Sequence, residues 1–258
     1  MLNRMIFDTH AHICDSVFDA DRSEVLRKAR EVGVGAIVAV GEDLSDAQRN
    51  IQIAEAYSII RPAAGLYPTI LDLEKAKDMR AFIRAQHAKF CAIGEVGLDF
   101  WAVKEEPKKE IQKEIFRSFI KLAEELDLPL NVHSRSAGRH AVAMLLECGA
   151  DRVQMHAFDG KASAALPAAE AGFYFSIPPS VIRSRQKQKL VKNLSLAHLL
   201  VETDSPVLGP DPQKRNEPSN VTVPLKAIAE LKNINPADVI DAIANNTKIL
   251  YGDILKHK

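Results

Sequence analysis

The amino-acid sequence predicts an α/β protein of the (β/α)₈ (TIM) barrel class with one extra helix near its C-terminus. Short apolar segments alternate with longer amphipathic segments about eight times, which is the number of strand–helix units that closes such a barrel. The short segments are apolar on both faces, as is typical of parallel strands covered by helices. The length of 258 residues is ample for one barrel, and we therefore expect a single domain over residues 1–258.

The expected elements follow each other in a regular order. The short segments predict strands over residues 5–10, 36–41, 61–66, 90–98, 128–134, 151–158, 173–177 and 196–204. The amphipathic segments predict helices over residues 21–33, 43–58, 73–90, 108–127, 137–149, 161–172, 181–193 and 220–233. Three glycines stand just after expected helices, where a left-handed conformation is common, namely Gly33, Gly149 and Gly172.

Two further segments complete the predicted fold. A last helix from about residue 236 to 245 is expected to pack outside the barrel. The stretch 207–220 is rich in Pro, Asn and charge, and it predicts a long loop after the eighth strand rather than a domain boundary. An open, doubly wound sheet is the alternative architecture, but it would suit a GxGxxG motif near the first strand, which the sequence does not contain.

The composition excludes several classes of function. Lys+Arg and Asp+Glu number 34 each, so no global electrostatic field favours binding to nucleic acid or membranes. The three cysteines form no CxxC motif, which argues against a disulfide framework or a zinc ribbon and favours a reducing compartment. No apolar run approaches the roughly 20 residues that span a bilayer. We therefore expect a cytoplasmic protein, a monomer, with neither a membrane partner nor an obligate protein partner.

Imidazole and carboxylate side chains stand at the ends of the expected strands. The carboxyl ends of the strands in a barrel share one rim, where catalytic residues collect. Five different strands would bring six good metal ligands to that rim, namely His10, His12, Glu95, His133, His156 and Asp204. The other four histidines are expected in helices, within a strand or at the tail, as structural or surface residues: His87, His140, His198 and His257.

The ligand set predicts two divalent metal ions. His10 and His12 are two residues apart on a strand, so both side chains point the same way and can bind one ion. A carboxylate such as Glu95 can bridge two ions. Four imidazoles and two carboxylates are more than one ion requires, and they favour Zn²⁺ or Mn²⁺ over Mg²⁺. A single histidine at a strand end is more often structural, so the prediction depends on the whole set.

Other polar residues near this rim have less specific signals. Asp204 is expected both to bind metal and to accept the proton of the attacking water. Glu202 is expected to orient a histidine ligand or an arginine, with a buried salt bridge as the alternative. The residues that can contact phosphate, but can equally be ordinary surface groups, are Ser134, Arg135, Arg215 and Asn216.

A basic stretch follows the expected seventh strand. Residues 183–193 read RSRQKQKLVKN. We predict that this stretch is a solvated helix face, and contact with a nucleic-acid backbone is the alternative.

The sequence resembles the TatD family of metal-dependent deoxyribonucleases in six segments that occur in family order. They are DTHAH (8–12), AIGEVGLDF (92–100), NVHSRSAG (131–138), MHAFDG (155–160), VETDSP (201–206) and RNEP (215–218). The segments HAFDG, FSIPPSVIRS and QKQKLVKNL are most similar to the third TatD-domain-containing paralogue of animals. The resemblance implies an amidohydrolase-type barrel, a divalent-metal site (Mg²⁺ included) and hydrolysis of nucleic-acid phosphodiesters, often as a 3′-to-5′ exonuclease.

The resemblance also implies roles for individual residues. His10 and His12 match the first ligand pair, and Glu95 matches the catalytic acid between the metals. Asp204 matches the catalytic acid that follows the last strand, and the later histidine ligands are matched by His133 and His156. In one place the sequence departs from the family pattern, because Tyr67 stands before Pro where many members have a histidine. Tyr67 can still donate one hydrogen bond to a substrate.

The sequence therefore predicts a hydrolase that cleaves phosphodiester bonds of DNA with a water activated by two metals. An amidohydrolase or esterase that acts on an acyl bond, such as a small amide or an aminoacyl-tRNA ester, is the first alternative. A metal-dependent binding protein without turnover is the second. Chelator-sensitive cleavage of oligonucleotides distinguishes the DNA phosphodiesterase from the acyl hydrolase and from the binding protein.

Overall fold

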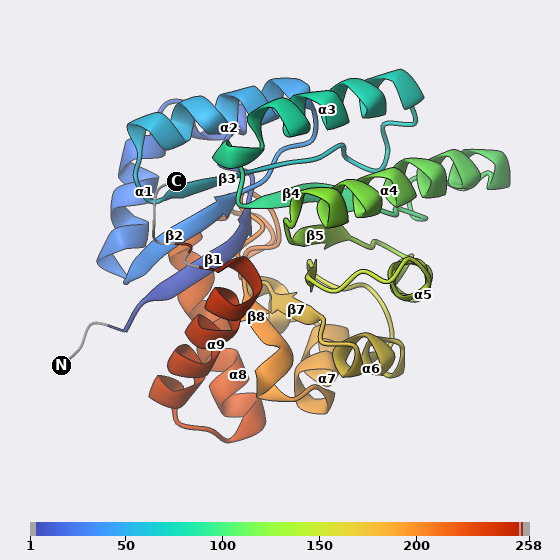
Figure 1. Ribbon diagram of the computed structural model, residues 1–258. Coiled ribbons are helices and arrows are strands. Elements are labelled where there is room, and N and C mark those ends of the chain that lie inside the picture. The colour runs from blue at the N-terminus through green and yellow to red at the C-terminus, as the bar shows by residue number, and fades with distance from the viewer. Residues whose placement is uncertain (1–3, 253, 255–258) are drawn as a thin grey trace.

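Eight parallel strands form a nearly closed barrel in the computed structural model, which describes residues 4–252 and 254 (Figure 1). Each strand pairs in parallel with the next one along the chain. The strands are β1 (Ile6–Ala11), β2 (Val34–Ala39), β3 (Ile60–Ala64), β4 (Ala92–Gly97), β5 (Leu130–His133), β6 (Val153–Met155), β7 (Tyr174–Ile177) and β8 (Leu199–Val201). The predicted barrel class is confirmed.

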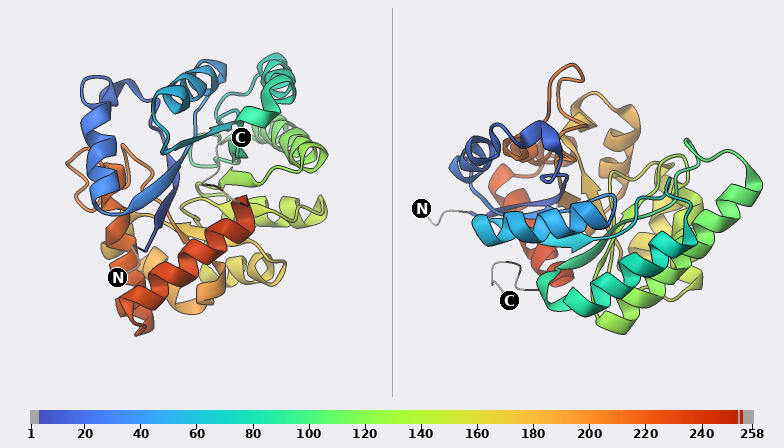
Figure 2. Two further views of the ribbon diagram at one scale, coloured as in Figure 1. Left: turned by 60° about the vertical axis from the view of Figure 1, so that its left-hand side comes forward. Right: turned by 90° about the horizontal axis from the view of Figure 1, so that it is seen from above.

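Helices surround the barrel on its outside, as the two views in Figure 2 show. They are α1 (Arg22–Glu31), α2 (Leu44–Ala56), α3 (Leu73–Gln86), α4 (Glu106–Leu126), α5 (Gly138–Glu147), α6 (Ala162–Glu170), α7 (Arg185–Asn193), α8 (Thr222–Lys232) and α9 (Pro236–Tyr251). In the described part of the chain, no helix is both long and apolar enough to cross a membrane. The extra C-terminal helix of the prediction is α9, which packs against α8 and β8.

Some boundaries differ from the sequence prediction. Helix α9 continues to Tyr251, past the expected end near residue 245, because Thr247 and Leu250 are also buried. His198 does not lie in a strand but ends a short 3₁₀ helix before β8, Leu196–His198. His257 lies outside the described residues. The three predicted helix-ending glycines all have positive φ angles, which confirms their expected role.

The barrel closes between its first and last strands through hydrogen bonds just beyond β8. The backbone N–H of Asp204 donates to the carbonyl of His10 at 2.8 Å, and the N–H of His12 donates to the carbonyl of Ser205 at 2.8 Å. The hydroxyl of Thr9 donates to the carbonyl of Val201 at 2.9 Å. These bonds fix Asp204 beside His10 and His12, although the residues are far apart in the sequence.

A hydrogen-bonded polar layer crosses the inside of the barrel. The hydroxyl of Tyr251 donates to Oε1 of Gln154 at 2.6 Å and accepts from Nδ2 of Asn131 at 3.2 Å. Nε2 of Gln154 donates to Oγ of Ser176 at 2.9 Å, and that hydroxyl donates to Glu202 at 2.6 Å. Buried polar groups are costly without partners, so this layer both satisfies its members and joins α9 to the floor of the carboxyl rim.

Candidate metal centre

The six predicted metal ligands meet at the carboxyl rim of the barrel. His10, Glu95 and His133 lie in β1, β4 and β5. His12 and His156 directly follow β1 and β6, and Asp204 is the third residue after β8. Five of them line a cavity of about 570 Å³, namely His12, Glu95, His133, His156 and Asp204. His10 lies behind them and is fully buried, with its Nε2 3.4 Å from Nε2 of His12.

One donor group consists of His10, His12 and two carboxylates. Nε2 of His12 lies 3.3 Å from Oε2 of Glu95 and 3.6 Å from Oδ1 of Asp204. Nε2 of His10 lies 3.8 Å and 3.5 Å from the same two oxygens. Two ligands about 2.1 Å from one ion at a tetrahedral angle are about 3.4 Å apart. The donor atoms therefore fit around a single divalent cation.

A second donor group shares the same two carboxylates through their other oxygens. Oε1 of Glu95 lies 2.6 Å from Nδ1 of His133 and 3.8 Å from Nε2 of His156. Oδ2 of Asp204 lies 3.7 Å from Nε2 of His156. Glu95 and Asp204 thus present one oxygen to each group. The resulting histidine–glutamate cluster is able to bind metal.

Buried partners orient the imidazoles. Nδ1 of His10 lies 2.8 Å from Oδ1 of Asn131, and Nδ1 of His156 lies 2.8 Å from Oε2 of Glu202. Each of these oxygens can accept the Nδ1 proton of its ring, which would leave Nε2 as the atom that coordinates a metal ion. Nε2 of His133 lies 3.1 Å from Oδ2 of Asp99.

The sequence analysis did not select Asn131 and Asp99. Both are fully or almost fully buried. Asn131 stands two residues before His133 on the same strand, and Asp99 stands four residues after Glu95. A polar residue inside an apolar segment, close to a predicted ligand, is the signal that would have indicated them.

Gly97 allows β4 to approach β5 closely at the ligand His133. Its φ angle is +147°, and a Cβ atom at this position would lie 2.1 Å from the carbonyl oxygen of His133. A side chain here would push the two strands apart and displace both Glu95 and His133.

The electrostatics of the cluster favour bound cations. Burial alone would lower the pKa of His10, but the hydrogen bond to Asp204 and the charge of Glu95 raise that pKa to about 10. Burial also opposes the charged form of His133. The charge of Glu95 and the contact with Asp99 nevertheless raise the pKa of His133 to about 9. Burial would raise the pKa of the Glu95 carboxyl, but His133 and His10 hold it well below its usual range. The carboxylate of Glu95 therefore stays ionised at neutral pH.

Metal binding is expected to release protons, and metal affinity is expected to rise with pH. His10 and His133 are protonated at neutral pH in the metal-free protein, because their pKa values are about 10 and about 9. A coordinating imidazole must be neutral, so the binding of each metal ion releases the proton from the imidazole that it coordinates. Isothermal titration in buffers of different ionisation enthalpy counts these protons. A binding enthalpy that is the same in every buffer would contradict the prediction.

Glu202→Gln is expected to weaken metal binding about 10- to 100-fold, the usual effect of removing an outer-shell partner. The carboxylate of Glu202 accepts three hydrogen bonds, from Nδ1 of His156, from N–H of Ala157 at 2.9 Å and from Oγ of Ser176. An amide has only one acceptor oxygen, so the orientation of His156 is loosened. Metal titration of the variant measures the effect, with the exposed Glu114→Gln on α4 as the control. Unchanged affinity in Glu202→Gln would refute the orienting role.

Two of the predicted substrate contacts lie at the cavity. Tyr67 and Arg135 both line it. The ring of Tyr67 packs against that of His133 at 5.1 Å between centroids, and burial raises the pKa of the Tyr67 hydroxyl. Ser134 is buried and does not line the cavity, and its Oγ has no hydrogen-bond partner among the described residues.

The other two predicted contacts, Arg215 and Asn216, do not line the cavity. Arg215 forms ion pairs with Asp21 at 2.6 Å and Glu217 at 3.1 Å. Asn216 is buried, and its Nδ2 donates to the carbonyls of Thr203 and Val207, both at 2.7 Å. Both side chains therefore hold the loop after β8 in place, a role that a count of basic and polar residues does not predict.

Most of the basic stretch 183–193 forms α7, and some of its side chains turn inward. Nζ of Lys187 donates to the carbonyl of Ala157 at 3.0 Å, and burial lowers the pKa of this lysine. Nε2 of Gln186 donates to the carbonyl of Gly160 at 2.6 Å. The prediction of a solvated face is thus wrong for Lys187, which instead holds the loop after His156.

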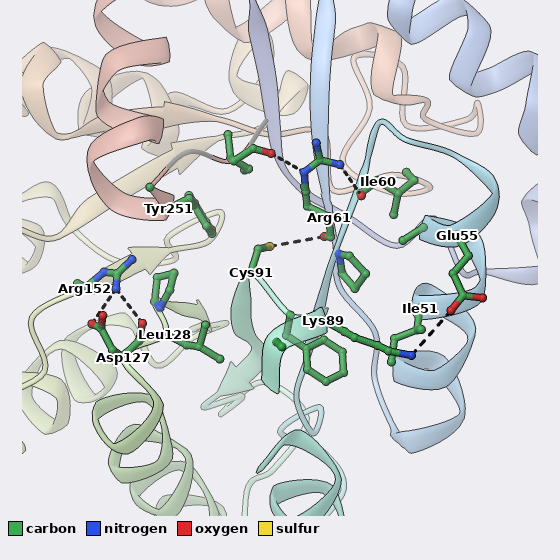
Figure 3. Close-up of a pocket in the computed structure, with 17 residues that line it drawn as sticks. Ile51, Glu55, Ile60, Arg61, Lys89, Cys91, Asp127, Leu128, Arg152 and Tyr251 are labelled. Carbon is green, nitrogen blue, oxygen red and sulfur yellow. Dashed lines mark hydrogen bonds and ion pairs between the residues drawn. The ribbon is translucent and has the colours of Figure 1, made fainter. Parts of the chain in front are cut away.

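A second cavity of about 580 Å³ lies at the amino ends of β3 to β6, at the other end of the barrel (Figure 3). Four of its charged side chains form ion pairs: Arg152 lies 2.9 Å from Asp127, and Lys89 lies 3.8 Å from Glu55. Arg61 donates to the backbone carbonyls of Ser58 and Ile60 at 2.8 Å and 2.9 Å. In the described part of the chain, none of the His, Cys, Asp and Glu clusters that could hold a metal ion lies in this second cavity. The candidate chemistry is therefore concentrated at the carboxyl rim.

A parallel barrel with an imidazole–carboxylate cluster at its carboxyl rim is an arrangement typical of metal-dependent hydrolases. The sequence model of the family described as "TatD related DNase" matches residues 7–252. The chain therefore belongs to the TatD family, and it is a hydrolase of the class that acts on ester bonds. The resemblance found in the sequence is confirmed.

Individual relatives agree with this assignment. The human protein named Deoxyribonuclease TATDN3 is 42% identical over 95% of this chain and 94% of its own length. The metal-dependent hydrolase YabD of Bacillus subtilis is 37% identical over 96% of this chain and 99% of its own length. The crystal structure of YjjV, a TatD homologue from Escherichia coli, has a TM-score of 0.89 at 26% identity and covers 97% of this chain and 99% of its own.

Proposed function

We propose that this protein hydrolyses phosphodiester bonds of DNA with two divalent metal ions and removes nucleotides from the 3′ end. The observation that carries the two-metal part is the shared orientation of Glu95 and Asp204, each of which turns one oxygen to each donor group. The names of the relatives supply the support for DNA as substrate, because the human relative is named a deoxyribonuclease.

The chain's own residues have distinct tasks in this reaction. Divalent ions, when bound, lower the pKa of water and stabilise charge on a phosphoryl group. Asp204 accepts the proton of the attacking water. Burial opposes the ionisation of its carboxyl, but the imidazoles of His156 and His10 hold its pKa below the usual range, so the group is ionised at neutral pH and able to take up a proton. Arg135 contacts a non-bridging phosphate oxygen, and Tyr67 donates one hydrogen bond.

Single-turnover digestion of single-stranded DNA labelled at the 3′ or the 5′ end tests the proposal. Chelated protein is supplied with Mg²⁺, Mn²⁺ or Zn²⁺. Metal-dependent release of the 3′ label as mononucleotide, with gradual shortening of the 5′-labelled strand, is the expected result. Release from the 5′ end would overturn the polarity alone.

The same experiment separates phosphodiester from acyl chemistry. Protein that demonstrably binds metal but leaves DNA intact with every ion would refute the nuclease proposal. Turnover of a small amide or an aminoacyl-tRNA ester by that protein would then assign the cluster to an acyl hydrolase.

A further inference from the structure

An exposed tryptophan stacks on Arg135, whose side chain lines the cavity of the candidate metal centre. Trp101 is the one tryptophan of the sequence, and it is 55% exposed, which is unusual for so large an apolar side chain. It lies in the loop between β4, which carries Glu95, and α4. An exposed aromatic ring beside a polar cavity is a candidate for ligand contact.

The backbone that carries this ring is held firmly in place. Oδ1 of Asp99 accepts the N–H groups of Trp101 at 3.0 Å and Ala102 at 2.8 Å, and its Oδ2 lies 3.1 Å from Nε2 of His133. The N–H of Phe100 donates to the carbonyl of Arg135 at 3.0 Å. One carboxylate thus connects the position of the tryptophan to that of a candidate metal ligand.

Arg135 joins the ring to the cavity. Its guanidinium carbon lies 3.7 Å from the centroid of the Trp101 ring, and the same side chain lines the cavity. A guanidinium stacked on an indole is held by cation–π attraction and keeps its N–H donors in the plane of the group. Arg135 is therefore positioned to contact a phosphate at the cavity while it remains against the ring.

The side chains that line the cavity supply little positive charge for binding a phosphate backbone. Three carboxylates line it besides the candidate ligands, namely Asp15, Glu42 and Asp46. Of the two arginines that line it, Arg49 forms an ion pair with Asp19. Apart from the proposed metal ions, the lining therefore offers little positive charge to a long phosphate backbone, and stacking of a base would add binding that charge does not supply.

We propose that Trp101 and Arg135 form a nucleotide subsite, in which a nucleobase stacks on the indole and Arg135 contacts the adjoining phosphate. This inference rests on the proposed function and specifies its substrate as an unpaired nucleotide at a strand end. Stacking tolerates any base, since every base has a π-face. A base inside a duplex is not available for the indole, so a single-stranded end is the preferred substrate.

Tryptophan fluorescence tests the subsite without any turnover. Because the chain has one tryptophan, its emission reports this position alone. Titration of the metal-loaded protein with dAMP is expected to change the emission at concentrations about 5- to 150-fold lower than titration with 2-deoxyribose 5-phosphate, which has no base. Equal responses to the two compounds, or no response to dAMP, would overturn the proposal.

A kinetic comparison supplies the second arm. Two oligonucleotides are compared, one that ends in a normal nucleotide and one that ends in an abasic nucleotide. In the wild type, kcat/KM for the normal end should exceed that for the abasic end by about 5- to 150-fold. Trp101→Ala should reduce this ratio to about one, Trp101→Phe should restore part of it, and the exposed Ile249→Ala on α9 should keep the wild-type ratio. A ratio that Trp101→Ala leaves unchanged would refute stacking. If the wild type cleaves neither oligonucleotide, the proposed nuclease function fails, and the fluorescence titration still decides the subsite.

Discussion

Asp204→Asn is expected to lower the rate constant of metal-dependent hydrolysis by about 10²- to 10⁴-fold, the range found when a general base is removed. The substitution keeps the shape of the side chain but removes its negative charge and its ability to accept a proton. It also weakens the contacts of Oδ1 with His10 and His12 and of Oδ2 with His156. Single-turnover rates on labelled DNA at saturating metal measure the effect.

The fold of this variant should survive. Asp204 has a φ angle of +54°, and asparagine tolerates this left-handed conformation well. The backbone hydrogen bond from Asp204 to His10 does not involve the side chain. Circular dichroism and thermal unfolding of the chelated protein are therefore expected to resemble those of the wild type.

Asp211→Asn is the matched control, because Asp211 lies in the same loop after β8 and pairs with Lys214 at 3.7 Å, away from the cavity. This variant should keep the wild-type rate. Near-normal turnover by folded Asp204→Asn would show that another group accepts the proton, and the assignment of the site would be wrong.

The sequence was sufficient to predict which candidate ligands meet, because the order of strands in the barrel largely determines it. Once the chain is recognised as an eight-stranded parallel barrel, a residue at the carboxyl end of one strand must lie near such residues on the other strands. His133 and His156 are thus brought near Glu95 without any knowledge of side-chain packing. The pairing of each carboxylate oxygen with a different donor group depends on rotamers and could not be derived.

Roles that depend on loop packing were not predictable in the same way. Arg215 and Arg135 have the same chemistry and both follow a strand end, but Arg215 is held by Asp21 and Glu217, whereas Arg135 stacks on Trp101. Lys187 belongs to a basic stretch, but its position on α7 directs its side chain to the backbone carbonyl of Ala157. These outcomes depend on which loops lie side by side, and no periodic pattern in the sequence records that.

Glu95→Gln is expected to reduce the number of bound divalent ions from two to one and to impair turnover more than the about 10- to 100-fold typical of an outer-shell change. Among the side-chain clusters that could hold a metal ion, one contains His12 and another contains His133. These two clusters share Glu95, and each uses a different oxygen of its carboxylate. Glutamine offers one oxygen and a nitrogen that cannot coordinate, so it can serve one group at most.

Metal content after equilibrium dialysis, measured by atomic emission, counts the ions in Glu95→Gln and in the wild type. The control is Glu110→Gln on α4, an exposed carboxylate that pairs with Lys113 at 2.7 Å and should leave both the metal content and the rate unchanged. One ion in both the wild type and Glu95→Gln would mean that the two donor groups serve a single metal. The shared position of Glu95 would then orient His133 instead of bridging ions, and a one-metal hydrolysis would replace the proposed mechanism.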